Sequence, residues 1–149
     1  MNKKILIGTG IFVLAIVFFF ARGSLTGNAV VGSYETTENL AVKIPVFEIS
    51  DNAVFYDYDG IKYFVVKAEE GSIKTAFNAC DICYQSRKGY RQEGGDMVCN
   101  NCGNHYAISG LGTKNLRGGG CWPGYLPNKV EGENLVLKKS DLEAGRYRF

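Results

Sequence analysis

Five cysteines and one histidine are the residues of this chain best suited to bind a metal or to carry out redox chemistry. The sequence contains no other cysteine or histidine, and all six lie within the 49 residues from Ala79 to Pro127. The six residues are Cys80, Cys83, Cys99, Cys102, His105 and Cys121. Thiolate and imidazole groups are the protein ligands that zinc and iron favour. This clustering predicts a metal or redox site.

Four of the cysteines form two Cys-x-x-Cys pairs, Cys80 with Cys83 and Cys99 with Cys102, separated by 15 residues. In such a turn the two sulfurs converge on one tetrahedral ion, and backbone N–H groups point at the thiolates. The spacing is at the short end of the range typical of a zinc-ribbon site, and Gly103 suits the tight turn after the second pair. We therefore predict that the four paired cysteines bind the metal. The spacing does not distinguish zinc from a single iron ion or an iron–sulfur cluster.

Cys121 and His105 are candidate additional ligands. Cys121 lies in a Gly-Gly-Cys-Trp-Pro sequence, where it could be a fifth ligand, a disulfide partner or a buried thiol. His105 follows Cys102 by three residues and could complete a mixed shell, although a lone histidine is more often a hydrogen-bonded surface residue. Aromatic residues that bracket the cysteines could shield a cluster from water or simply fill a small core. They are Tyr84, Tyr90, Tyr106, Trp122 and Tyr125.

The cysteine-containing segments resemble a known family. The segments on which this resemblance rests are Ala76–Tyr84, Gly89–Gly94, Val98–Gly103 and Gly119–Pro123. Together they resemble the FtrD-like membrane iron–sulfur protein family, from about Val42 to the C-terminus. The resemblance implies an extracytoplasmic, membrane-attached domain of iron–sulfur type, linked in some members to iron uptake and thought to pass electrons. It also implies Cys80, Cys83, Cys99 and Cys102 as the paired ligands and Cys121 as the fifth family cysteine.

The N-terminal part of the chain predicts a membrane attachment. Ile5–Ala21 is a 17-residue stretch without a charge, preceded by two lysines and followed by Arg22. As a helix it would be about 26 Å long, enough to cross the hydrocarbon layer, and the lysines favour a cytoplasmic N-terminus. We expect residues 1–22 to form a single transmembrane anchor, with a cleaved signal peptide as the alternative. Larger members of the family carry several membrane helices, and this chain has at most one.

Residues 23–39 are rich in Gly, Ser, Thr and Asn, which is typical of a flexible linker. From residue 40 to 149 the pattern predicts a small, mainly β domain, a meander or sandwich-like fold that carries the cysteine site. An edge strand interrupted by Pro45 comes first. The Asp59-Gly60 turn then predicts a hairpin in 52–67, because Gly tolerates the positive φ of a type I′ turn. Its predicted pairs are Tyr58 with Ile61, Asp57 with Lys62, Tyr56 with Tyr63, Phe55 with Phe64 and Val54 with Val65.

Further strands are expected after the hairpin. A turn at 70–72 leads to a strand over Ile73–Phe77, and a loop or loose hairpin over 85–95 precedes a short strand over Asp96–Cys99. Another strand is expected to leave the second cysteine turn over His105–Ile108. Val130–Lys138 and Gly145–Phe149 are predicted as closing strands around a turn at 140–144.

The composition excludes some classes of function. A net charge of +2, without a cluster of Lys and Arg, does not match a nucleic-acid-binding domain. The sequence has one histidine and no paired carboxylates, so it lacks the catalytic residues that a hydrolase needs. Three hypotheses remain. The first is a membrane-anchored electron-transfer or metal-handling protein that holds iron or an iron–sulfur cluster and has a redox partner in the membrane. The second is a zinc-stabilised binding module, and the third is a thiol–disulfide oxidoreductase. Among these, we expect a redox or metal-binding protein in preference to an enzyme.

Overall fold

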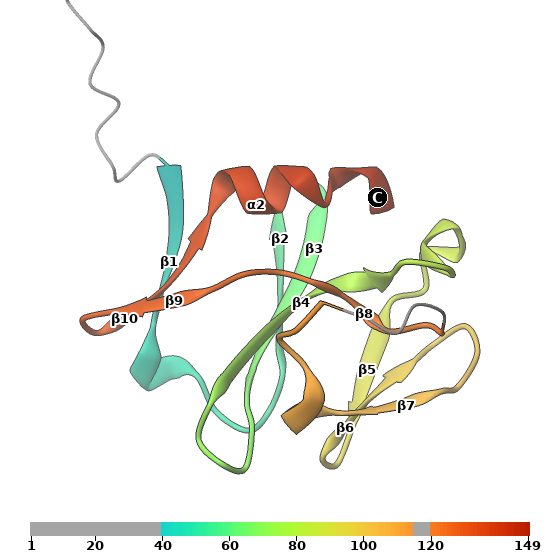
Figure 1. Ribbon diagram of the computed structural model, residues 1–149, viewed down its shortest axis with the longest axis horizontal. Helices are drawn as coiled ribbons and strands as arrows, with labels where there is room; N and C mark the ends of the chain where they lie inside the picture. The colour runs from blue at the N-terminus through green and yellow to red at the C-terminus, as the bar shows by residue number, and fades with distance from the viewer. Residues whose placement is uncertain (1–39, 115–119) are drawn as a thin grey trace, which may run out of the picture. The chain divides into compact units, whose positions relative to one another are not determined.

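A computed structural model describes residues 40–114 and 120–149 (Figure 1). The predicted anchor, residues 1–22, and the predicted linker, residues 23–39, lie outside the described residues. Within the described ranges, no helix has the length and apolar character needed to cross a bilayer.

Three antiparallel sheets make up the described part of the chain. The first has the order β1-β10-β9, formed by Ala41–Pro45, Asn134–Lys138 and Lys129–Glu131. The second has the order β2-β3-β4-β8, formed by Val54–Tyr58, Ile61–Lys67, Ile73–Cys80 and Pro123–Tyr125. The third has the order β5-β6-β7, formed by Tyr90–Glu93, Asp96–Cys99 and His105–Ala107. The mainly β fold predicted from the sequence is confirmed.

Short helical segments connect or follow these strands. The α-helix α2 spans Lys139–Ala144. The 3₁₀ segments are η2 (Val46–Glu48), η3 (Tyr84–Ser86), η4 (Ile108–Gly110) and η5 (Arg146–Arg148).

The hairpin β2–β3 has the register that its turn predicts. Asp59 and Gly60 both have positive φ, 50° and 83°, as a two-residue type I′ turn requires. All five predicted pairs are present, from Tyr58 with Ile61 to Val54 with Val65. The meander also continues as predicted, because β3 pairs with β4 after the turn at 70–72.

Strand β3 is buried on both faces and separates two hydrophobic cores. Tyr63 and Val65 point into a core built with the first sheet and α2, where Leu135, Leu137 and Leu142 are fully buried. Phe64 and Val66 point to the opposite face, into a core shared with the third sheet and with three cysteines. The period-2 alternation of a strand therefore sends its side chains alternately to the two cores. The cysteine site lies in the second core, to which three of the cysteines belong.

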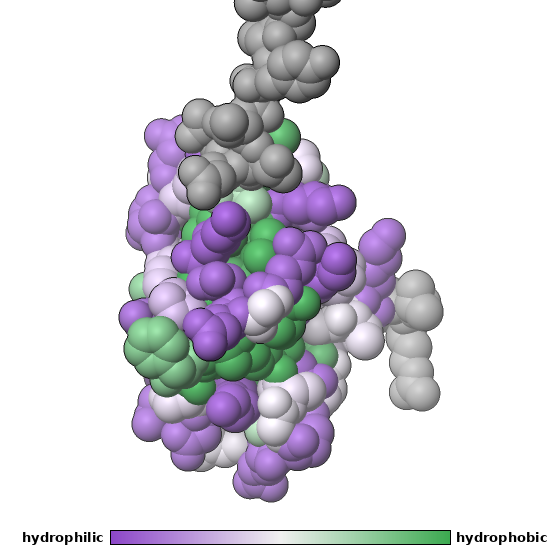
Figure 2. Space-filling view, turned by 90° about the vertical axis from the view of Figure 1, so that its left-hand side faces the viewer, coloured by the Kyte–Doolittle hydropathy of each residue, from purple (hydrophilic) through white to green (hydrophobic). Residues whose placement is uncertain are grey.

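The first sheet covers the side of the domain away from the cysteines. Its strand β1 lies at the sheet edge and ends at Pro45, as predicted. Figure 2 views this side and shows apolar surface between polar residues. Exposed apolar side chains here include Val130 of β9 and Phe47 of η2, which follows β1.

Two predictions for the C-terminal part are wrong. Gly145–Phe149 is not a strand, because its residues form η5 and pack Phe149 against Phe77. The predicted turn at 140–144 is helix α2. The predicted strand over Val130–Lys138 is confirmed in part, since it consists of β9 and β10 joined by a turn at Gly132, which has a φ of 59°.

Candidate metal centre

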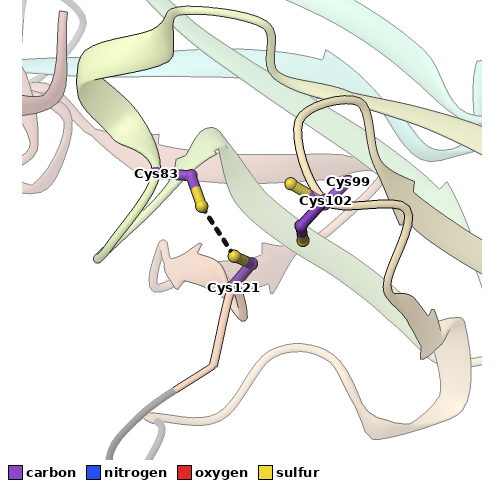
Figure 3. A group of neighbouring side chains, drawn as sticks. All are labelled: Cys83, Cys99, Cys102 and Cys121. Atoms are coloured by element: carbon purple, nitrogen blue, oxygen red, sulfur yellow. Dashed lines mark hydrogen bonds between the residues drawn. The ribbon is translucent and has the colours of Figure 1, made fainter.

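Four thiols from three separate segments converge at one end of the second core. Cys83 lies in the turn after β4, Cys99 ends β6, Cys102 lies in the turn that follows, and Cys121 precedes β8. Their sulfurs all lie within 4.8 Å of one another. Figure 3 shows the four side chains directed toward a common centre. All five cysteines of the chain are free thiols.

The turn that carries Cys99 and Cys102 is closed by backbone hydrogen bonds. The Gly103 N–H donates to the Cys99 carbonyl at 2.8 Å, and the Cys99 N–H donates to the Asn104 carbonyl at 3.0 Å. Gly103 has a φ of 74°, a conformation that a residue with a Cβ rarely adopts. This is the tight turn that the glycine after the second cysteine pair predicts.

The pairing of β4 with β8 brings Cys121 to the first cysteine turn. Cys80 is the register partner of Pro123, which lies two residues after Cys121. The Cys121 and Cys83 sulfurs are consequently 2.8 Å apart. A residue far from the two Cys-x-x-Cys pairs in sequence thus joins three of the four predicted ligands.

Cys80 lies beside this group without belonging to it. It is the buried last residue of β4, and its sulfur accepts a hydrogen bond from the Cys83 N–H at 2.6 Å. A backbone N–H directed at the first sulfur is the feature expected of a Cys-x-x-Cys turn. The convergent group therefore contains Cys83, Cys99 and Cys102 with Cys121, and Cys80 is adjacent to it. The assignment of Cys80 as a ligand stays a prediction.

The environments of the thiols differ. Cys99 and Cys121 are buried, Cys83 is half-buried and Cys102 is exposed. Burial raises the pKa of the Cys121 thiol, and the hydrogen bond between the Cys83 and Cys121 sulfurs lowers the pKa of Cys83. A hydrogen bond from the Asn104 backbone lowers the pKa of Cys102. Cys83 and Cys102, the two more accessible thiols, therefore deprotonate more readily than the buried Cys121.

The donor set and its spacing fit a thiophilic metal. A tetrahedral ion with metal–sulfur bonds of about 2.3 Å holds its sulfurs about 3.8 Å apart. The observed sulfur–sulfur distances, at most 4.8 Å, are close to this value. A cluster bridged by inorganic sulfide spreads its thiolates more widely, so it would require outward movement of the turns. Four soft sulfur donors favour zinc, iron or an iron–sulfur cluster over hard cations such as Mg²⁺.

His105 lies outside the sulfur group. Its side chain is 53% exposed, and its Nδ1 lies 3.2 Å from Asp96 Oδ2. Its Nε2 lies 4.0 Å from Glu93 Oε2. The structure therefore places this histidine between two carboxylates on the surface of the third sheet, the commoner role for a lone histidine.

Aromatic side chains back the buried side of the group. Tyr90 is buried, and its hydroxyl donates to the Cys121 carbonyl. The Tyr106 ring packs edge-on against Tyr90 and against Trp122, with centroid distances of 6.3 and 5.3 Å. Three of the five aromatic residues expected to bracket the cysteines thus pack against or within the same core. Tyr84 instead packs edge-on against Tyr147.

Arg148 is a residue of the site that the sequence analysis missed. Its guanidinium forms an ion pair with Asp81, inside the turn between Cys80 and Cys83, and lies 5.1 Å from the centre of the Phe77 ring. These contacts tie the C-terminal segment to the first cysteine turn. No local pattern signals them, because Asp81 and Arg148 are 67 residues apart.

A comparison with protein families finds a match over most of the described residues. The family described as "Membrane iron-sulfur containing protein FtrD-like" matches residues 45–149. The chain belongs to this family. The resemblance stated from the sequence motifs is thereby confirmed, and with it the expectation of an iron–sulfur-type protein associated with a membrane, as the family description has it. No curated protein matches the chain.

Solved structures offer only distant likenesses. The ferredoxin of carbazole 1,9a-dioxygenase from Nocardioides aromaticivorans IC177 is 16% identical with a TM-score of 0.44, covering 66% of this chain and 97% of that one. The quaternary ammonium Rieske monooxygenase CntA, in complex with an inhibitor, is 10% identical with a TM-score of 0.46, covering 66% of this chain and 30% of that one. Likenesses this weak do not assign a fold or an activity.

Proposed function

We propose that this protein binds iron through its cysteine thiolates, as an iron–sulfur cluster or as a single ion, and transfers electrons or handles iron for a partner in iron uptake. The observation that carries the proposal is the convergence of four sulfurs within 4.8 Å in a chain of the FtrD-like iron–sulfur family. Bound in this way, iron would supply one-electron redox chemistry.

The accessibility of the thiols supports electron exchange with a partner. Cys102 is exposed and Cys83 is half-buried, so one edge of the group faces solvent. On the other side, Tyr90, Tyr106 and Trp122 separate it from water. The buried side lets the surrounding residues set the reduction potential of the centre. The exposed side gives electrons a short path to a partner protein.

The ligand set we favour is Cys83, Cys99, Cys102 and Cys121. Cys80 remains the alternative fourth ligand, because the Cys-x-x-Cys spacing and its hydrogen bond from the Cys83 N–H both suit a coordinated thiolate. The two sets share three cysteines and differ in a single residue.

A membrane attachment through residues 1–22 belongs to the same proposal. The uncharged stretch Ile5–Ala21 and the lysines before it support a single span with a cytoplasmic N-terminus. The domain from residue 40 onward would then lie outside the cytoplasm, reached through the linker of residues 23–39. The family description supports the membrane location in general.

Two other functions keep specific support. Zinc satisfies the same tetrahedral thiolate set, in which case the metal would stabilise a module that acts by binding partners. Thiol–disulfide exchange is favoured by the 2.8 Å approach of Cys83 to Cys121, where Cys83 has the lowered pKa and Cys121 the raised one.

The deciding experiment is metal analysis of the full-length protein, expressed and purified anaerobically in detergent. Iron, acid-labile sulfide and zinc are measured on the same sample, together with the visible absorption spectrum. Iron with visible thiolate-to-iron absorption, lost in Cys99→Ser, is the expected result. One zinc per chain without colour would refute the iron proposal, and a metal-free protein that titrates reversibly as a dithiol would support the exchange function instead.

A further inference from the structure

A cavity of about 430 Å³ opens beside the cysteine group. Its lining includes the three cysteines Cys80, Cys83 and Cys99, together with Lys62 and Phe149. A volume of this size accommodates a small organic molecule. The cavity is distinct from the space between the four convergent sulfurs, since Cys102 and Cys121 do not line it.

Apart from the thiols, the charged side chains that line the cavity are all basic. They are Lys62, Arg87, Lys88 and Arg148, and the lining includes no aspartate or glutamate. Within residues 40–114 and 120–149, Lys62, Arg87 and Lys88 form no ion pair with a carboxylate. Arg148 is paired with Asp81 through Nη2, while its Nε is buried without a hydrogen-bond partner among the described residues. Four cationic side chains around one cavity, three of them without an ion-paired carboxylate among the described residues, favour a positive potential there.

The loop that presents two of these cations is fixed in place. The Asn100 side chain donates to the Lys88 carbonyl at 2.9 Å, and the Asn100 N–H donates to the Gly89 carbonyl at 3.0 Å. Asn78 Oδ1 accepts the Tyr90 N–H at 2.7 Å. Arg87 itself has a φ of 52°, an unfavourable conformation for a residue with a side chain. A loop held this way fixes the backbone of Arg87 and Lys88 before a ligand arrives, which lowers the ordering cost of binding.

We propose that this cavity binds a small oxyanion that carries more than one carboxylate or phosphate group. Guanidinium and ammonium groups bind such anions through charge-assisted hydrogen bonds, and arginine can do so through two donors at once. A cationic ligand would be repelled by the same side chains, and a neutral one would gain little from them. The bound anion would lie near Cys80, Cys83 and Cys99, which also line the cavity.

The test is a titration of the full-length protein in detergent with citrate and, separately, with inorganic pyrophosphate, followed by isothermal calorimetry. The informative variant is the double substitution Arg87→Gln/Lys88→Gln, because both side chains are exposed and the fold does not depend on them. The matched control is Lys43→Gln/Lys129→Gln, which removes the same charge from exposed positions on the first sheet, away from the cavity.

We expect saturable binding of at least one of the two anions, weakened roughly tenfold or more in the Arg87/Lys88 variant and changed less than about twofold in the control. Binding of citrate alone or of pyrophosphate alone would identify the preferred anion and support the site. The proposal is overturned if neither anion binds, or if both double variants weaken binding equally, because a general charge effect would then explain the affinity.

Discussion

Replacing single cysteines should show which thiol completes the ligand set. The two candidate sets share Cys83, Cys99 and Cys102 and differ in Cys80 or Cys121. The convergence of the sulfurs predicts that Cys121→Ser weakens metal binding strongly. Cys80→Ser should weaken it only slightly, because the Cys80 sulfur lies outside the group.

The size of the effect follows from the number of ligands. Structural tetrathiolate-type sites bind zinc with an apparent free energy of about 10–16 kcal/mol, so one of four ligands accounts for roughly 2.5–4 kcal/mol. Cys121→Ser should therefore lower the affinity roughly a hundredfold or more. In the wild type the Cys83 N–H donates a hydrogen bond to the Cys80 sulfur at 2.6 Å. The hydroxyl introduced by Cys80→Ser can still accept this hydrogen bond. The effect of this substitution should stay within about tenfold, as for residues that only orient a ligand.

The assay is anaerobic competition of the full-length protein with a chromophoric chelator, after loading with Zn²⁺ or Co²⁺. Cys99→Ser serves as the reference for a lost ligand, because both candidate sets include it. Thermal unfolding of each metal-free variant shows whether the substitution has damaged the fold itself. If Cys80→Ser loses as much affinity as Cys99→Ser while Cys121→Ser binds like the wild type, the geometric argument is refuted and the set based on spacing is correct.

Three further predictions concern stability. Gly145→Ala should destabilise the fold by about 1–3 kcal/mol, because a Cβ there would lie 2.1 Å from the Phe77 ring in a buried position; thermal unfolding measures it. Thr75→Val should cost about 1–3 kcal/mol in denaturant unfolding, because the buried hydroxyl donates to a backbone carbonyl at 2.7 Å and accepts from a side-chain amide at 2.8 Å. The Arg146 side chain lowers the pKa of Glu143 below its ordinary value of 4.5, so this carboxylate stabilises the fold above that pH and the contribution disappears as the pH falls through the folded pKa. Glu143→Gln should therefore lose less stability than the wild type on acidification, as followed by circular dichroism.

Each of these predictions has a control. Gly95→Ala introduces a methyl group with no neighbour within 4 Å and should change stability little, so equal effects at the two glycines would contradict the packing argument. Thr75→Ser keeps the hydroxyl and should retain most of the hydrogen-bonding contribution. Arg146→Gln should reproduce the flatter acid response of Glu143→Gln, and a wild-type response in either variant would exclude the ion pair as its cause.

The parts of the fold that depend on neighbouring residues were predictable from sequence. Asp59 and Gly60 determine the turn of the β2–β3 hairpin, and the alternating residues on either side determine its register. The tight turn at Gly103 followed in the same way from the glycine after the second cysteine pair. In both cases a local conformational requirement selected one structure.

The parts that depend on distant contacts were not. The pattern of the last residues, with Tyr147 and Phe149 alternating with arginines, is typical of a strand. It forms η5 instead, because Arg148 and Phe149 pack against Phe77. Likewise, the position of Cys121 depends on the pairing of β4 with β8, which no spacing between cysteines reveals.

Strand β3 makes the two cores one cooperative unit. Tyr63 and Val65 are buried on one side and Phe64 and Val66 on the other, so neither core can open without exposing a strand that the other needs. Backbone amides on both sides should therefore exchange with solvent through a common global opening instead of separate local ones. A ligand that binds only the folded cysteine side would then protect amides of β10 in the far sheet, although it contacts none of them.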